Sequence, residues 1–179
     1  MRLVNAVSTR RIIVLAMLAV GLATSAKAQE RKGFYFGVGM GYGSLGIGCD
    51  GCQGAGRESG LSGHLRLGGT VSQHVQLGVE STGWYKSDQG AELNVGTLTG
   101  NIYVYPRATT PLFLKGGLGL GALTDGYDSQ TGFGWQAGAG YDIRLGTKTA
   151  LTPTLTYFMG HFDGGSTNVM QFALAFSLY

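Results

Sequence analysis

The 179-residue chain has few charged residues, 3 prolines, 2 cysteines and no long apolar run beyond its first 28 residues. Charged residues make up 13% of the chain, whereas aromatic residues make up 11% and glycine occurs 33 times. Disordered chains are rich in charge and poor in aromatics, so this composition excludes disorder. A helical domain is excluded because each glycine in a helix costs about 1 kcal/mol relative to alanine. The missing apolar run of about 20 residues excludes a transmembrane helix after residue 28. The composition favours many strands that carry small residues on one face.

The first 28 residues have the pattern of a cleaved secretory signal peptide. A basic, acid-free segment is followed by an apolar run at residues 12–23 and by Ala26-Lys27-Ala28, a small-x-small cleavage site. The run is too short to cross ~30 Å of hydrocarbon as a helix. We expect residues 1–28 to be removed and residues 29–179 to form one domain. Removing four basic residues and no acidic one takes the formal net charge from +3 to −1, so no basic surface for nucleic acid remains.

The last segment, Val169 to Tyr179, alternates large apolar side chains with small or polar ones. Its large row is Met170, Phe172, Leu174, Phe176 and Leu178. A soluble protein with such a strand at a free edge would be prone to aggregation. A strand that closes a barrel in a bilayer has no free edge, and its apolar row faces lipid. The segment therefore predicts a transmembrane β-barrel.

Eight segments show this alternation. They are residues 33–43, 60–69, 75–85, 92–105, 112–122, 132–145, 149–160 and 169–179. The connections between them alternate long and short, which is typical of an outer-membrane barrel whose termini both lie in the periplasm. A strand of about 11 residues, tilted by ~45°, rises roughly 25 Å, enough to cross the apolar band. The predicted fold is all-β, an eight-stranded antiparallel up-and-down barrel with a polar, glycine-rich lumen.

Two local features disturb the pattern. Leu93 and Val95 are out of phase with the rest of their segment, which a bulge or a late strand start near Gly96 would repair. Pro153 lies inside a segment although proline cannot donate to a ladder. Aromatic residues gather near the segment ends, where we expect interfacial girdles. The expected girdles are Phe34, Tyr103, Tyr105 and Tyr141 at the periplasmic rim, and Trp84, Tyr85, Phe133, Trp135 and Tyr157 at the outer rim.

Charged residues within the segments fall on the small-residue row. They are Arg66, Glu80, Lys115, Asp142 and Arg144. Turn geometry predicts ion pairs between Arg66 and Glu80 and between Lys115 and Asp142, inside a lumen that eight strands leave just wide enough for side chains. An open pore is not expected. A soluble lipocalin-like carrier, the alternative barrel, would place its apolar row inside.

The signal peptide, the eight alternating segments and the ending Phe176-Ser177-Leu178-Tyr179 resemble the small outer-membrane barrels of the OmpA/OmpX type. The resemblance implies a monomer in the outer membrane, in contact with lipid and lipopolysaccharide, with external loops as the binding surface and no cofactor. It also implies an assembly signal for the barrel-assembly machinery, formed by Phe172, Phe176, Leu178 and Tyr179. In that group the terminal aromatic residue lies on the lipid-facing row, whereas Tyr179 falls on the small-residue row. Either Tyr179 turns outward or the signal is read one residue earlier.

Cys49 and Cys52 form the only CxxC motif. Zinc needs four ligands, and no second ligand pair follows in the sequence. In an exported chain with two cysteines, a disulfide within a loop is the expected outcome.

His161, Asp163 and Ser166 share the last predicted loop and suggest a hydrolase trio. Barrel enzymes that modify lipid A place a serine and a histidine near the outer rim, but their His-x-Ser arrangement is absent here. His64 and His74 are isolated, and we expect them to be structural rather than metal ligands. The sequence therefore predicts a scaffold or interaction protein, not an enzyme, with a lipid-modifying enzyme as the alternative.

Overall fold

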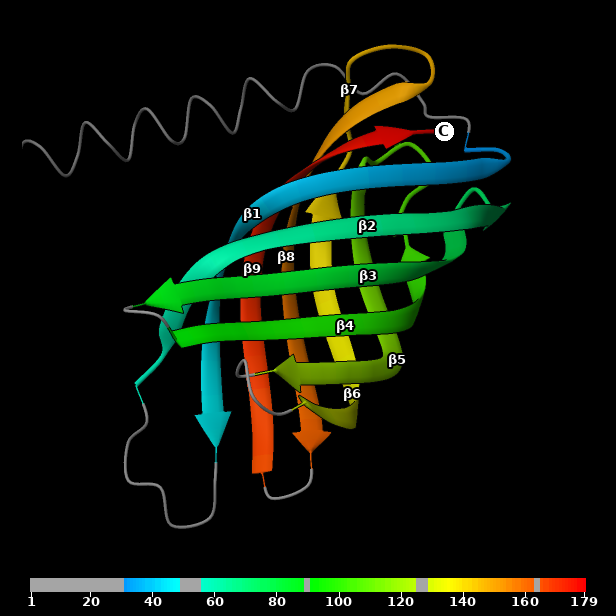
Figure 1. The fold of residues 1–179 in the computed structure, drawn as a ribbon. Helices are drawn as coiled ribbons and strands as arrows, with labels where there is room; N and C mark the ends of the chain where they lie inside the picture. Colours follow the sequence, from blue (N-terminus) through cyan, green and yellow to red (C-terminus); the bar gives the residue numbers. More distant parts are fainter. Residues whose placement is uncertain (1–30, 49–55, 89–90, 125–128, 163–164) are drawn as a thin grey trace, which may run out of the picture.

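The computed structural model describes residues 31–48, 56–88, 91–124, 129–162 and 165–179. Nine strand segments form one antiparallel sheet that closes on itself (Figure 1). They are β1 (Phe34–Gly48), β2 (Glu58–Ser72), β3 (Val75–Asp88), β4 (Ala91–Val104), β5 (Leu112–Thr124), β6 (Ser129–Tyr141), β7 (Ile143–Arg144), β8 (Thr149–Phe162) and β9 (Gly165–Leu178). β6 and β7 are two parts of one strand interrupted at Asp142, and both pair with β8. The predicted eight-stranded up-and-down barrel is confirmed. None of the described residues forms a helix that could cross a membrane.

The barrel is closed by pairing of β1 with β9, which lie side by side in Figure 1. The register around the barrel is staggered. Starting at Phe36, the paired residues are Leu67, Val79, Gly100, Leu118, Trp135, Met159, Asn168 and finally Gly46 on β1. The path returns to β1 ten residues beyond its start, so the strands are strongly tilted, as closure of a barrel requires.

The two ends of the barrel differ. One end, here the turn end, carries the start of β1, the end of β9 and the connections 73–74, 105–111 and 145–148. The other, the loop end, carries the connections 49–57, 89–90, 125–128 and 163–164. The loop-end connections are shorter than predicted because the strands, apart from β7, run for 13 to 15 residues. Backbone pairing continues beyond the apolar rows, since ladder hydrogen bonds form whatever side chains flank them.

The large apolar row of each strand faces outward. Phe34 is 84% exposed, and Met40, Leu118 and Phe172 are each more than half exposed. The opposite row is buried and holds glycine, threonine and the lumen charges. This arrangement contradicts the lipocalin-like alternative, which needs the apolar row inside, and it suits a barrel surrounded by lipid.

The structure corrects one local prediction and explains a second irregularity. β4 pairs with β3 without a register shift, so Leu93 and Val95 are not displaced by a bulge or a late strand start. Val95 instead points into the lumen and is buried. Pro153 is accommodated because the ladder between β6 and β8 ends at Gly140 and resumes at Ile143, so its missing N–H falls at a break.

The girdle prediction is partly wrong. Trp84, Tyr103 and Tyr105 are buried inside the barrel rather than placed at its lipid-facing rims. Phe34, Tyr85, Phe133 and Trp135 are exposed on the outer surface, and Tyr141 and Tyr157 are half-buried there. Position near a strand end was a poorer guide than alternation, because Trp84 and Tyr103 share the inward row of their strands with Glu80 and Asn101.

Candidate functional site: a filled lumen between two closed ends

The turn-end half of the lumen is organised around the buried carboxylate of Asp142. Thr152 Oγ1 donates to Asp142 Oδ1 at 2.9 Å, and Tyr105 Oη donates to Asp142 Oδ2 at 2.9 Å. The Arg66 guanidinium, 1% exposed, forms an ion pair with Asp142 at 3.5 Å and donates to Ser177 Oγ at 2.7 Å. Charged groups away from water are stable only when paired and hydrogen-bonded. Both Asp142 oxygens and Arg66 Nη2 have such partners, whereas Arg66 Nε and Nη1 are buried without one.

A second ion pair lies deeper in the lumen. Lys115 Nζ donates to Glu80 Oε1, and Tyr103 Oη donates to Glu80 Oε2 at 2.9 Å. The lysine and glutamate side chains are both buried. Four of the five predicted lumen charges are therefore brought together, but the predicted partners are exchanged: Arg66 pairs with Asp142 and Lys115 pairs with Glu80.

Arg144, the fifth predicted lumen charge, lies at the turn end rather than in the lumen network. Its Nη1 donates to the backbone carbonyl of Thr147 at 3.1 Å. Strand β7 ends at Arg144, so this side chain is half-buried beside the turn that follows.

Glycines make room for the large lumen side chains. A Cβ on Gly37 would lie 2.8 Å from Arg66 Nε, so the arginine side chain passes directly over the bare backbone of β1. Tyr35 lies in the same way over Gly78, and Phe113 lies over Gly140. A side chain at these positions would displace one of the lumen groups. The glycine-rich row therefore allows a narrow barrel to hold an arginine and several aromatic rings.

Aromatic rings pack around Arg66 to form the turn-end cluster, which consists of Tyr35, Tyr103, Tyr105 and Phe113 with Tyr179 against them. The Arg66 guanidinium lies 5.6 Å from the centroids of both the Tyr35 and the Phe113 rings. Cation–π attraction of this kind strengthens when the groups are desolvated. Burial and the nearby Asp142 carboxylate raise the pKa of Tyr105 and of Tyr179 well above their usual value. Both hydroxyls are therefore neutral: Tyr105 Oη donates to Asp142, and Tyr179 Oη accepts from Arg66.

Arg31, just before β1, seals the turn end. It is 1% exposed, and its guanidinium lies 3.5 Å from the centroid of the Tyr105 ring. Its Nη1 and Nη2 donate to the carbonyls of Ala108 at 2.9 Å and Thr110 at 2.8 Å. Gly33, with φ +79°, adopts a conformation that other residues rarely adopt and turns the chain into β1. Sequence reasoning missed Arg31 because carbonyl acceptors in a distant turn leave no sequence pattern.

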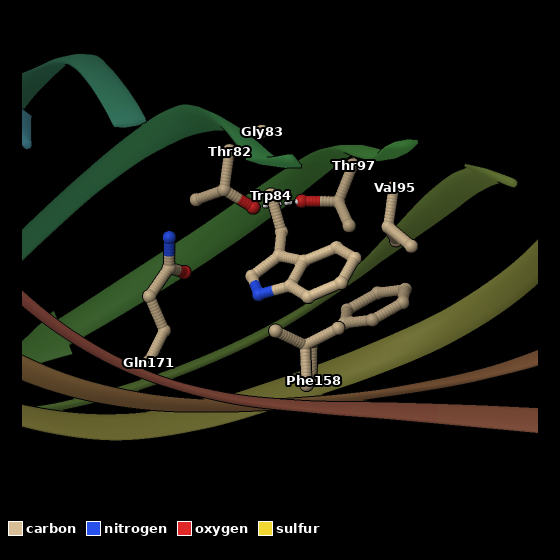
Figure 2. A pocket seen from close by; sticks show the side chains of 8 residues that line it. Thr82, Gly83, Trp84, Val95, Thr97, Phe158 and Gln171 are labelled. Atoms are coloured by element: carbon tan, nitrogen blue, oxygen red, sulfur yellow. Dashed lines mark hydrogen bonds between the residues drawn. The ribbon is translucent and has the colours of Figure 1, made fainter. Parts of the chain in front are cut away.

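An apolar group, the loop-end cluster, closes the other half of the lumen. It contains Leu45, Trp84, Val95 and Val169, with Leu93 and Leu123 packed against them. Figure 2 shows the Trp84 ring facing the Phe158 ring across the barrel interior. Trp84 Nε1 donates to the carbonyl of Gly43 at 3.0 Å, so the one polar atom of the indole is satisfied. The apolar side chains that disturbed the predicted phase of β4 thus form this closure.

A small cavity of about 10 Å³ remains beneath Trp84 (Figure 2). Its lining includes Thr82 and Thr97, whose hydroxyls are hydrogen-bonded to each other, and Gln171. Such a volume holds one water molecule at most. At this level of the barrel, the side chains of the described residues therefore fill the lumen.

The loop-end rim carries a few exposed polar contacts. Arg57 Nη1 donates to Asn168 Oδ1 at 2.6 Å and its Nε donates to Ser44 Oγ at 2.9 Å, which ties β2 to the β1–β9 seam. Lys86 forms an ion pair with Glu58. The predicted disulfide between Cys49 and Cys52 lies outside the described residues. The predicted signal peptide, residues 1–28, also lies outside them.

The candidate hydrolase residues are placed only in part. His161 and Ser166 are directly opposite each other across the β8–β9 hairpin, and Asp163 lies outside the described residues. In the part of the chain that the structure describes, no side-chain hydrogen bond joins His161 to Ser166. His64 is buried on the inward face of β2 and His74 is exposed in the β2–β3 turn. Within the described ranges, no three side chains that could ligate a metal come together.

The proposed assembly signal is split between the two faces of β9. Phe172, Phe176 and Leu178 are exposed on the outer surface, as the alternation predicted. Tyr179 does not turn outward: its ring packs 6.3 Å from that of Tyr35, and its hydroxyl accepts from Arg66 Nη2 at 3.2 Å. The alternative in which Tyr179 turns outward is therefore wrong, and an assembly signal read one residue earlier stays a prediction.

A family model for the outer membrane protein beta-barrel domain matches residues 12–178. The chain belongs to this family. Its barrel is an outer-membrane barrel, and the outward apolar rows are its membrane-facing surface. A comparison with proteins of curated function finds no match.

Solved structures show the same fold. Ail, the attachment invasion locus protein of Yersinia pestis, is 12% identical with a TM-score of 0.60, and the match covers 82% of this chain and 99% of Ail. Neisserial surface protein A is 13% identical with a TM-score of 0.59, covering 81% of this chain and 96% of that protein. Both are similar in fold to this outer-membrane barrel.

Proposed function

We propose that this outer-membrane barrel is a non-conducting scaffold that acts through its loop-end rim. The observation that carries the proposal is the filled lumen. The turn-end cluster, the two buried ion pairs and the loop-end cluster occupy it in succession, and Arg31 covers its turn end. An eight-stranded barrel has no spare cross-section for a solute path once these side chains are in place.

Permeability tests this proposal directly. The purified protein, without residues 1–28, is refolded into liposomes and their swelling is followed in isotonic solutions of arabinose and glucose. We expect the swelling rate of protein-free liposomes. A swelling rate that rises with the amount of folded protein would contradict the proposal. Folding is checked on the same samples by the shift of the band on a detergent gel after boiling.

The loop-end rim is the surface through which a filled barrel can act outside the cell. A structure of Ail has been solved in complex with the heparin analogue sucrose octasulfate, so a polyanion is the first partner to consider. The sequence at the loop end argues for a different partner. Its connections and adjoining strand ends hold Asp50, Glu58, Asp88, Glu92, Asp125, Asp128 and Asp163 against only Arg57 and Lys86. This excess of acid favours a cationic partner surface.

Two probes distinguish these partners. The barrel in lipid nanodiscs is titrated with heparin and, separately, with poly-lysine at low and at 0.15 M salt. We expect binding of poly-lysine that weakens as salt is added, and no binding of heparin. Heparin binding comparable to that of poly-lysine would reject the cationic partner and favour the sulfated glycan.

A lipid-modifying enzyme is supported by one observation, the placement of His161 opposite Ser166 on β8 and β9. The pair lacks the hydrogen bond through which a histidine activates a serine, although such bonds tighten in some enzymes when substrate binds. We expect lipid A from cells that express His161→Ala or Ser166→Ala to give the same mass spectrum as lipid A from cells with the unsubstituted protein. A wild-type-dependent loss of an acyl chain that either substitution abolishes would establish the enzyme.

A further inference from the structure

Among the residues that the structure describes, the exposed charged side chains at the turn end are basic. Lys32 precedes β1, Arg107 lies in the β4–β5 connection, and Lys148 lies in the β7–β8 connection, and all three are exposed. Arg144, half-buried at the end of β7, is the fourth base. Of the described acidic residues, only Asp142 is near this end, and it is buried and paired with Arg66. The rim therefore presents positive charge on several sides of the barrel.

These bases lie at the edge of the apolar band. Phe34 follows Lys32 by two residues, and Leu145 directly follows Arg144; both apolar side chains are more than half exposed. Val71, at the start of the β2–β3 turn, is exposed in the same way. Large apolar side chains next to long cationic ones are typical of the membrane interface, where the apolar part enters the hydrocarbon and the charge reaches the headgroups.

The loop end has the opposite balance. Seven of the ten acidic residues of the chain belong to its connections and adjoining strand ends, together with two basic ones. Inside the lumen, the two acids and two bases neutralise each other. The two ends of the barrel thus differ in the sign of their charge, and they border different leaflets of the membrane.

We propose that the turn-end rim is a docking surface for the headgroups of anionic phospholipids in the leaflet that it borders. The guanidinium of Arg107 and the ammonium of Lys148 are two of its exposed donors. Guanidinium and ammonium groups form charge-assisted hydrogen bonds with phosphate oxygens. A basic residue near an anionic membrane surface contributes a factor of about five in affinity.

The test compares two matched double variants of the mature protein. Arg107→Gln with Lys148→Gln removes two bases from the turn end, and Arg57→Gln with Lys86→Gln removes two from the loop end. Each protein is refolded in detergent, and its retention of phosphatidylglycerol and phosphatidylcholine is measured by native mass spectrometry over a range of lipid concentrations. All four side chains lie outside the buried network, so we expect both variants to fold. The shift of the band on a detergent gel after boiling checks this.

We expect the unsubstituted barrel to retain phosphatidylglycerol more strongly than phosphatidylcholine. The turn-end double variant should lose roughly 25-fold in affinity for phosphatidylglycerol, and the loop-end variant should not lose affinity. Equal retention of the two lipids, or an equal loss in both variants, would overturn the proposal. Competition by soluble glycerol phosphate at the concentration of the lipid headgroup would also overturn it, because it would show an anion site that does not require the membrane.

Discussion

Arg66 lies directly opposite Glu80 in the paired strands β2 and β3, but its guanidinium forms an ion pair with Asp142, beyond strands β1, β9 and β8. The side chain takes this path over Gly37 of β1, whose missing Cβ leaves the space that Arg66 Nε and Cγ occupy. Glu80 then pairs with Lys115 and accepts a hydrogen bond from Tyr103. Gly37 thus leaves room for the path by which Arg66 reaches Asp142.

Substituting this glycine should destabilise the barrel. Gly37→Ala places a methyl group 2.8 Å from Arg66 Nε and 3.2 Å from Ser177 Oγ, so the arginine has to leave its hydrogen bonds. We expect the free energy of unfolding to fall by about 1–3 kcal/mol, the range for overpacked interiors. Urea unfolding in phospholipid vesicles, followed by tryptophan fluorescence, measures this change.

The matched control is Gly63→Ala. Gly63 faces outward on β2, and the atom nearest to an added Cβ is 3.8 Å away. Its unfolding midpoint should stay close to that of the unsubstituted protein. If both substitutions have the same effect, the lumen path of Arg66 over β1 is not what makes Gly37 necessary.

Replacing one partner of the Lys115–Glu80 pair should lower the free energy of unfolding more than replacing both. Lys115→Met leaves the Glu80 carboxylate buried with Tyr103 as its remaining donor, and loss of one partner of a buried pair costs about 3–5 kcal/mol. The double variant Lys115→Met with Glu80→Gln leaves no uncompensated charge and should recover most of that loss. Urea unfolding of the two single variants and the double variant measures the coupling. Additive effects would show that the two groups do not interact in the folded barrel.

Arg31 should stabilise the turn end although it precedes the first strand. Arg31→Ala removes charge-assisted hydrogen bonds to Ala108 and Thr110 and the contact with Tyr105. We expect a loss of about 1.5–3 kcal/mol, the range for hydrogen bonds to charged groups. Faster amide hydrogen exchange in residues 105–111 should accompany the loss. If the amides of residues 105–111 exchange at the same rate in the variant and in the unsubstituted protein, Arg31 does not stabilise the turn end.

The alternation of side chains was sufficient to predict the barrel, because each strand has one lipid-facing row and pleating places every second residue on it. The same rule, followed strictly, would also have placed Trp84 and Val95 inside, since both share their strands' inward row. The expectation of aromatic girdles took precedence over it for Trp84, and the expectation of a bulge or late strand start near Gly96 took precedence over it for Val95. The loop-end connections were predicted too long because nothing in the side-chain pattern marks where backbone pairing stops.

The partners of the lumen charges were beyond sequence reasoning for a different reason. Register identifies neighbours, and it correctly placed Arg66 beside Glu80. Ion pairing in a narrow lumen depends instead on where side chains can cross it, and Arg66 crosses over the bare backbone of Gly37. Arg31 acts through backbone carbonyls of the β4–β5 connection, whose positions the sequence does not encode in any local pattern.

The arrangement of the two tryptophans offers the most direct test of the account, in which lipid surrounds an apolar exterior and large side chains fill the interior. Trp84 is 1% exposed inside the lumen, and Trp135 is 40% exposed on the outer surface. Trp84→Phe and Trp135→Phe each leave a single tryptophan, which is measured in vesicles of brominated phosphatidylcholine. Bromine quenches fluorescence on close contact, so the account predicts strong quenching of Trp135 and little quenching of Trp84. Equal quenching of both, or stronger quenching of Trp84, would contradict it.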